Sequence, residues 1–307
     1  MAVVIAALLP VFILIVLGVV LRHSLMRLDT QWHGLERLTY FVLFPMLLIQ
    51  TLVKADLSKV PVAGVGGALL LSALAMSLLC LALRPALSRL DIDGPAFTSI
   101  FQGSVRWNTF VGLALAAGLQ GRTGTTLMAI AVAAMIPLLN VMCVFVLARF
   151  ASGKPMSIGA TIRSILYNPF IWSSALGLVL NQLQWMLPSA FTGYLDVLGR
   201  ASLGIGLLVV GSALDLDRLA RPRLAHAVAV GLKLGLMPVL AWLYAGWFGV
   251  TGPALAMTVV ASAVPTATAA YFLARDLGGD APLMAEITTL QTLLALATLP
   301  AAVFLLI

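Results

Sequence analysis

Residues Ala254–Asp276 read ALAMTVVASAVPTATAAYFLARD, an apolar segment with a proline at its centre and hydroxyl side chains around it. Its length and composition are typical of a membrane-spanning helix. Pro265 removes one backbone donor and clashes with the preceding turn, so the freed carbonyls need another partner or a polar cavity. Transporters place substrate sites at such broken helices. A simple kink, satisfied by Thr266, Thr268 and neighbouring helices, is the alternative.

The composition excludes the soluble classes of protein. Of the 307 residues, 62% are hydrophobic and 9% are charged, and the mean hydropathy is +1.09. We therefore expect an all-α polytopic protein of a bacterial inner membrane, with the lipid bilayer as its surroundings. The apolar run Ala2–Leu21 is long enough to be the first helix and lacks the charged start of a signal peptide.

Charge and cysteine content argue against other partners and cofactors. The net charge of +7 comes mostly from loops, as membrane orientation requires, so we expect no nucleic-acid partner. Cys80 and Cys143 lie in separate apolar runs and indicate neither a disulfide nor a metal site. No cofactor is expected.

Hydropathy divides the chain into ten apolar segments joined by short loops. They predict a first five-helix unit over residues 1–150, a short cytoplasmic linker over 151–161 and a second unit over 162–307. The segments are approximately 2–21, 35–53, 61–83, 95–119, 123–149, 162–181, 190–213, 224–249, 253–274 and 281–306.

Positive charge predicts the orientation. Twelve Lys and Arg residues lie in the odd-numbered loops and four in the even-numbered loops, so both termini are expected on the non-cytoplasmic side. The first group is Arg22, Arg27, Arg37, Arg84, Arg89, Arg149, Lys154, Arg163, Arg218, Arg221, Arg223 and Arg275; the second is Lys54, Lys59, Arg122 and Arg200.

The two halves resemble one another in sequence. Pro10 and Gly18 correspond to Pro169 and Gly177 at an offset of 159 residues, and Asp56–Leu57 falls on Asp215–Leu216 at the same offset. The fourth and ninth segments align at roughly 157 residues. Because each half has an odd number of segments, the two enter the membrane from opposite sides, which predicts an inverted repeat.

The fourth segment has the highest concentration of polar groups at membrane depth. Arg106 is the strongest single clue, because an ionisable side chain there usually faces a cavity or a partner, at a cost of about 2.5–3.5 kcal/mol by insertion scales. Its guanidinium and the Asn108 amide are suited to a carboxylate, although a side chain that snorkels to the interface is the alternative. The expected substrate-binding residues are Gln102, Arg106, Asn108, Thr109, Pro265, Thr266 and Thr268, with both threonines opposite Arg106 and Asn108.

Other polar residues are weaker candidates. Glu286 and Lys233 are candidate proton- or ion-coupling groups, but interfacial charges explain them better. Gln50 and Gln291 are typical of hydrogen bonds between helices rather than of ligands. The segments Tyr40–Pro45 and Pro137–Asn140 offer further kinks and hydrogen-bonding groups near the cavity. The histidines, His23, His33 and His226, are expected in loops or at helix ends, in no metal or catalytic cluster with a carboxylate.

Several motifs together resemble the auxin efflux carrier family of membrane transporters, whose bacterial members include malate and malonate carriers. The resemblance covers almost the whole chain. It rests on Leu9–Gly18, Phe44–Leu48, Arg106–Thr109 with Gly112–Ala114, Ile136–Asn140, Asn168–Pro169, Pro265–Tyr271, Ala274–Arg275 and Gly279–Asp280.

The resemblance implies ten helices in two inverted five-helix repeats, with a scaffold half, a transport half and crossing broken helices, the fourth and the ninth, at the substrate site. This fold is similar to that of bile-acid symporters and sodium/proton antiporters. Asn108 and Pro265 match the family's crossover positions. Plant members carry a proline after the glycine of the fourth helix, where this chain has Leu113.

These observations favour a secondary carrier of a small organic anion that works by alternating access. Exchange driven by membrane potential, or coupling to protons or sodium, is compatible with the sequence, and a homodimer is a further expectation. The alternative is a channel-like or sensor module, which lacks support because rings of charge and filter-like segments are absent from the sequence. No nucleophile with a base and no metal cluster shares one depth, so no enzyme is expected.

Overall fold

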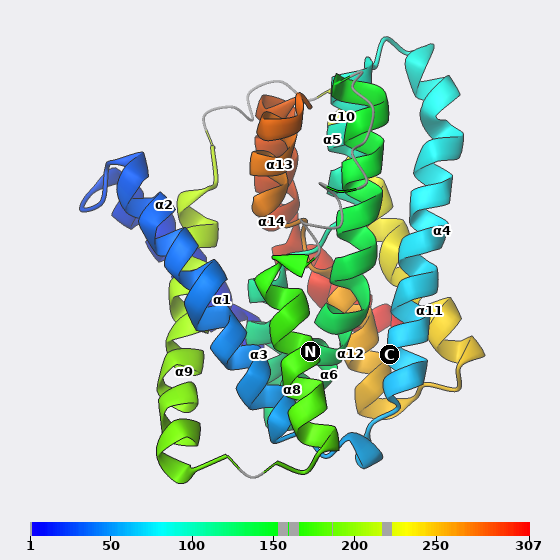
Figure 1. Ribbon diagram of the computed structural model, residues 1–307. Coiled ribbons are helices and arrows are strands. Elements are labelled where there is room, and N and C mark those ends of the chain that lie inside the picture. Colours follow the sequence, from blue (N-terminus) through cyan, green and yellow to red (C-terminus); the bar gives the residue numbers. More distant parts are fainter. Residues whose placement is uncertain (1, 153–158, 160–165, 186, 217–222) are drawn as a thin grey trace.

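The chain is a helical bundle whose helices run side by side along one direction (Figure 1). The computed structural model describes residues 2–152, 159, 166–185, 187–216 and 223–307, and within these ranges no strand occurs. Seven of the described segments are long and apolar enough to cross a membrane. Composition and structure together therefore define a polytopic membrane protein.

The first half of the chain contains six α-helices, two π-helical turns and one short 3₁₀ turn. They are α1 (Ala2–His23), α2 (Asp29–Leu38), η1 (Thr39–Leu43), α3 (Phe44–Val53), η2 (Leu57–Lys59), α4 (Val62–Ser88), α5 (Gly94–Val105), α6 (Thr109–Leu147) and η3 (Ala148–Ser152).

The second half contains seven described α-helices and one π-helical turn. They are α8 (Pro169–Gln182), α9 (Ser189–Ser212), α10 (Leu224–Val230), η5 (Gly231–Leu236), α11 (Met237–Trp247), α12 (Gly252–Ala263), α13 (Ala269–Leu277) and α14 (Ala281–Leu306). Most of the predicted linker, 151–161, and the start of the predicted sixth segment lie outside the described residues.

The long helix α6 turns back on itself at Gly121. This glycine has φ +54° and ψ −129°, a conformation that side chains with a Cβ rarely adopt. A Cβ on Gly94, at the start of α5, would lie 2.0 Å from the carbonyl oxygen of Phe150. The beginning of α5 and the turn after α6 are therefore adjacent. The chain thus runs in one direction before Gly121 and in the opposite direction after it, in agreement with the predicted segments 95–119 and 123–149.

The helices pack as two groups. In one group α1 packs against α9, and α3 packs against both α8 and α9. In the other, α4, α5 and α6 pack with α10–α14, and α6 also contacts α1, α3, α8 and α9. Figure 1 shows the first group on one side of the bundle and α4 with α11 on the other. Helix α6 is thus the main element shared by the two groups.

Glycines allow the close approach of α1 to α9. A Cβ on Gly211 would lie 1.9 Å from the carbonyl oxygen of Ile15, and one on Gly18 would lie 2.2 Å from that of Leu208. Small residues that let backbones approach are the usual means of packing helices in a membrane, where the hydrophobic effect does not drive helices together.

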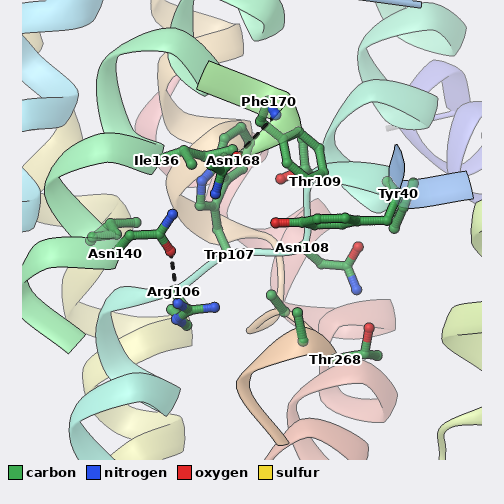
Figure 2. A pocket seen from close by; sticks show the side chains of 14 residues that line it. Tyr40, Arg106, Trp107, Asn108, Thr109, Ile136, Asn140, Asn168, Phe170 and Thr268 are labelled. Carbon is green, nitrogen blue, oxygen red and sulfur yellow. Dashed lines mark hydrogen bonds between the residues drawn. The ribbon is translucent and has the colours of Figure 1, made fainter. Parts of the chain in front are cut away.

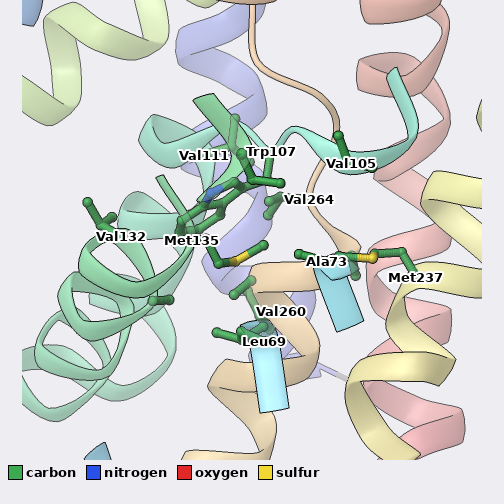
Figure 3. Packing of buried hydrophobic residues seen from close by; sticks show 14 of the residues in the cluster. Leu69, Ala73, Val105, Trp107, Val111, Val132, Met135, Met237, Val260 and Val264 are labelled. Atoms are coloured by element: carbon green, nitrogen blue, oxygen red, sulfur yellow. The ribbon is translucent and has the colours of Figure 1, made fainter. Parts of the chain in front are cut away.

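The second group has a dense apolar core around the end of α5 and the end of α12. Figure 3 shows Trp107 and Val264, which follow those two helices, packed among side chains of α4, α6, α11 and α12. Trp107 is 3% exposed and Val264 is fully buried. The non-helical residues between the helices are therefore held inside the bundle, where each of their polar groups needs a partner.

We predict that Gly211→Ala destabilises the protein by about 1–3 kcal/mol, because the new methyl group would overlap the backbone of α1. The measurement is thermal unfolding in detergent. Gly204→Ala is the matched control on the same helix, since no atom lies within 4 Å of a Cβ there. Equal stability of the two variants would contradict the α1–α9 contact.

Candidate functional site

The chain has two short non-helical breaks, one between α5 and α6 and one between α12 and α13, and these two interruptions meet. Helix α5 ends at Val105 and α6 begins at Thr109, and α12 ends at Ala263 while α13 begins at Ala269. The backbone N–H of Asn108 donates to the carbonyl oxygen of Pro265 at 2.7 Å, which joins the two interruptions directly.

The first interruption forms without a proline. Arg106 is extended, with ψ 160°, and its N–H still donates to the Gln102 carbonyl. Asn108 then caps α6, because its Oδ1 accepts from the N–H of Val111 at 3.2 Å. Asparagine is among the strongest N-cap residues, so a new helix can start here although Leu113 replaces the proline of plant carriers.

Gln291 of α14 satisfies the backbone at both interruptions. Its Oε1 accepts from the Thr266 N–H at 3.0 Å, and its Nε2 donates to the carbonyls of Gly103 at 2.9 Å and Ala229 at 3.0 Å. The side chain is fully buried. The interpretation of Gln291 as a link between helices, rather than a ligand, agrees with these bonds.

A small pocket lies beside the interruptions (Figure 2). Its volume is about 90 Å³, far below the ~300–1,000 Å³ of sites for drug-sized ligands. It suits a molecule of a few heavy atoms. The lining residues are Tyr40, Arg106, Trp107, Asn108, Thr109, Phe110, Ile136, Leu139, Asn140, Asn168, Phe170, Ala267, Thr268 and Ala269.

The pocket is largely apolar, and a positive charge and hydrogen-bond donors are among its few polar groups. The Arg106 side chain contacts α6 inside the bundle: its Nη2 donates to Asn140 Oδ1 at 2.9 Å, and its Nε lies 3.4 Å from Cys143 Sγ. The first residues of α6 and of α13 also line the pocket, so the positive ends of two helix dipoles converge there. The lining residues include no Asp or Glu.

Two residues that line the pocket each carry a buried donor without a partner among the described residues. The donors are the Asn108 Nδ2 and the Trp107 Nε1, both on buried side chains. Buried donors without a partner are costly, by about 1–3 kcal/mol each, unless a ligand or water accepts from them. The pocket is therefore chemically matched to an acceptor, and its guanidinium favours an anionic one.

The predicted site residues fall into two sets. Arg106, Asn108, Thr109 and Thr268 line the pocket. Gln102, Pro265 and Thr266 are buried at the interruptions but are not among its lining residues. The sequence predicts that Thr266 faces Arg106. In the structure the Thr266 hydroxyl instead donates to the Gln102 carbonyl at 3.3 Å.

Sequence reasoning did not single out Trp107, Asn168 or Phe170 as lining residues. Asn168 caps α8, where its Oδ1 accepts from the Phe170 N–H at 2.9 Å. The pair Asn168–Pro169 is itself a helix-start signal, but it does not reveal that the helix begins at the pocket. Tyr40, from a segment expected near the cavity, contacts Phe170 edge to face with ring centroids 4.9 Å apart.

Glu286 and Lys233, the candidate coupling groups, are both buried inside the bundle. Glu286 is 6% exposed, and its Oε2 lies 2.8 Å from His226 Nε2, a pairing that the sequence analysis missed. The N–H of Arg223 donates to His226 Nδ1, which leaves the proton on Nε2 to face the carboxylate. Lys233 is fully buried, and its Nζ has no hydrogen-bond partner among the described residues.

A polytopic helical bundle with a small donor-lined pocket between interrupted helices has the architecture of a membrane transporter. The family model described as "Membrane transport protein" matches residues 3–303. The chain belongs to this family, which is the auxin efflux carrier family that its motifs resemble, and it is a transport protein rather than an enzyme.

Two relatives have transporter names. A protein of Methanothermobacter thermautotrophicus, named "Uncharacterized transporter", is 25% identical over 309 aligned residues that cover 95% of each chain. A protein of Rhizobium meliloti, named "Putative malonate transporter", is 28% identical over 196 residues, which cover 59% of this chain and 61% of that protein.

We predict that Gln291→Leu destabilises the protein by at least about 2 kcal/mol, because two carbonyls and one N–H would lose a buried partner. Thermal unfolding in detergent measures the loss. Gln182→Leu, at an exposed position of α8, is the control and should change stability by less than about 0.5 kcal/mol. A Gln291 variant as stable as the control would show that these bonds are dispensable.

Proposed function

We propose that this protein is a secondary carrier of a small organic anion, a mono- or dicarboxylate, which it moves by alternating access. The observation that carries the proposal is the composition of the pocket. Arg106 and two helix N-termini line it together with Trp107 and Asn108, whose buried donors have no partner among the described residues, and no acidic side chain lines it. A carboxylate complements every one of these groups. The name of the Rhizobium meliloti relative is consistent with a three-carbon dicarboxylate.

Arg106 would bind one carboxylate, with the Asn108 amide, Thr109 and the start of α13 near Thr268 as further donors. Asn140 would hold the guanidinium in position through its 2.9 Å bond. Gln102, Pro265 and Thr266 would support the site through the backbone contacts at the interruptions rather than touch the anion.

We further propose that the chain forms ten membrane segments in two inverted five-helix repeats. Contacts related by the 159-residue offset support this. Gly18 packs against Leu208, and the residues at that offset, Gly177 and Ile49, are also in contact. The packing of α1 on α9 thus matches the packing of α8 on α3, and each of these contacts joins the two halves of the chain.

The bond between the interruptions supports the same symmetry. Asn108 and Pro265 are equivalent residues at the 157-residue offset of the fourth and ninth segments, and they bond to one another. A residue that contacts its own equivalent lies near a two-fold axis. In this proposal the fourth segment, α5 with the first part of α6, crosses the ninth, α12 with α13, at that axis.

Alternating access would then move one group of helices against the other. Tyr40, Asn168 and Phe170 bring the first group to the pocket, whereas Arg106 and Thr268 come from the second. An anion bound there contacts both groups, so a relative displacement can carry it from one side of the membrane to the other.

From the sequence we further propose a bacterial inner-membrane location, both termini on the non-cytoplasmic side, and a homodimer. The driving force is proposed as membrane potential or ion coupling, with Glu286 and Lys233 as candidate coupling groups. Because His226 Nε2 lies 2.8 Å from Glu286 Oε2, a coupling role of Glu286 would involve that partner. The alternative function is a channel-like module with a continuous polar path.

Counterflow in proteoliposomes tests the carrier proposal. Labelled malonate, malate and indole-acetate are each supplied outside against an excess of the unlabelled anion inside, with no ion gradient. We expect saturable, trans-stimulated uptake of at least one anion. Uptake that does not saturate and is not stimulated from the opposite side would favour the channel-like alternative. No uptake by folded protein would contradict transport of a simple carboxylate.

We predict that Arg106→Gln lowers anion affinity roughly 10- to 100-fold, because it removes about 1.5–3 kcal/mol of charge-assisted hydrogen bonding. The concentration dependence of counterflow measures the change. Arg122→Gln, at the exposed turn beside Gly121, is the matched control and should transport as the wild type does. Unchanged affinity in the Arg106 variant would remove this residue from the site.

We predict a smaller effect for Asn140→Leu, because the guanidinium stays but loses its 2.9 Å partner. The half-saturation concentration in the same assay should rise several-fold while the maximal rate falls less. A loss as large as that of the Arg106 variant would show that Asn140 binds the anion itself.

A further inference from the structure

Lys233 is the most unusual charged residue of the described chain. Its side chain is fully buried and is among the largest side chains with less than 2% exposure. Its Nζ has no hydrogen-bond partner among the described residues. A buried charge is normally paired or bound to a ligand, so a lysine in this position calls for a function.

The π-helical turn η5 places Lys233 next to the interruptions. His226, Ala229, Lys233 and Met237 recur every three or four residues along α10, η5 and α11, and all four are buried. On this face Ala229 accepts from Gln291, and its Cβ lies 3.5 Å from the position of a Cβ on Gly103. Lys233 therefore follows one turn after the contact with the end of α5.

The elements packed against η5 offer this lysine no free carboxylate. They are α5, α10, α11, α12 and α14. Their described titratable residues are His226 and Glu286, which pair with each other, and Tyr244, which contacts Trp247; Arg106 follows α5 and bonds to Asn140. An ammonium in the observed arrangement would be uncompensated, whereas a neutral amine needs no counter-charge.

We propose that Lys233 is the proton-binding group of the carrier, so that the anion travels together with a proton; this inference rests on the proposed function. The amine lone pair takes a proton from the side to which the pocket is open, and one N–H bond forms. The anion in the pocket favours the resulting ammonium through its opposite charge. Release of the anion on the other side leaves the ammonium uncompensated, and the proton leaves.

Placement of the lysine relative to the helix ends supports the same coupling. The positive ends of α6 and α13 face the pocket. The negative, carbonyl end of α5 includes Gly103, which packs against Ala229 on the same helix face as Lys233. A cation is favoured near a helix C-terminus. The fully buried amide of Gln102, whose two polar atoms have no partner, lies in the same turn of α5 as Gly103.

Accumulation of labelled malonate in proteoliposomes tests this inference, with the membrane potential clamped at zero and the outside one pH unit more acidic than the inside. One-to-one proton coupling predicts about tenfold accumulation in the wild type, since one pH unit corresponds to a factor of ten. Lys233→Met keeps a side chain of similar length but removes the amine that binds the proton. We expect this variant to retain counterflow and to raise the inside concentration only to the outside concentration, without accumulation above it.

Lys54→Met, at the exposed C-cap of α3, is the matched control and should accumulate malonate as the wild type does. Lys233→Gln is a second neutral variant in case the methionine variant does not fold, and size-exclusion chromatography monitors folding. Equal accumulation by the wild type and the folded Lys233 variants would overturn the inference, as would a wild type that shows counterflow but no accumulation. Either result would leave the carrier proposal standing. A wild type without counterflow of any anion would overturn both.

Discussion

The hydrogen bond from the Asn108 N–H to the Pro265 carbonyl is the contact on which the rest of the structure depends. Water is absent from the hydrocarbon region of a bilayer, so an interrupted helix there must satisfy its exposed backbone groups inside the protein. Two interruptions that meet can satisfy this requirement together, because the Pro265 carbonyl accepts from Asn108 and the Thr266 hydroxyl donates to the Gln102 carbonyl. Gln291 completes the arrangement with three further bonds to the backbone.

This solution separates the two kinds of helix end. The N-terminal ends of α6 and α13 line the pocket, where their dipoles and Arg106 create a positive region. Some carbonyls near the end of α5 are instead satisfied inside the bundle, by Thr266 at Gln102 and by Gln291 at Gly103. The same backbone breaks thus give the proposed anion site on one face and a packed core on the other.

Much of this organisation is predictable from the sequence, because it depends on strong local signals. Apolar runs locate the helices, Pro265 locates one interruption, and the offset of about 157 residues locates the other near Asn108. Arg106 is recognisable as a site residue because a charge at membrane depth is costly and seldom lacks a role. These inferences need only the residue type and its position along a helix.

Partners across helices are not predictable in the same way. The pairing of His226 with Glu286, the burial of Lys233 and the turn of Thr266 away from Arg106 depend on which faces meet after packing. The π-helical turn at Lys233 also shifts the helical register and leaves no clear pattern in the sequence. The burial of these charged groups therefore follows from tertiary packing and not from their positions along the helices.

The most direct measurement of the central claim is the position of bound anion in a crystal of the protein soaked with bromomalonate, located by the anomalous signal of bromine. The expected result is one peak in the pocket between Arg106 and the first residues of α6 and α13, which disappears when excess malonate competes. A peak elsewhere in the bundle, with this pocket unoccupied, would contradict the assignment of the two helix interruptions as the anion site.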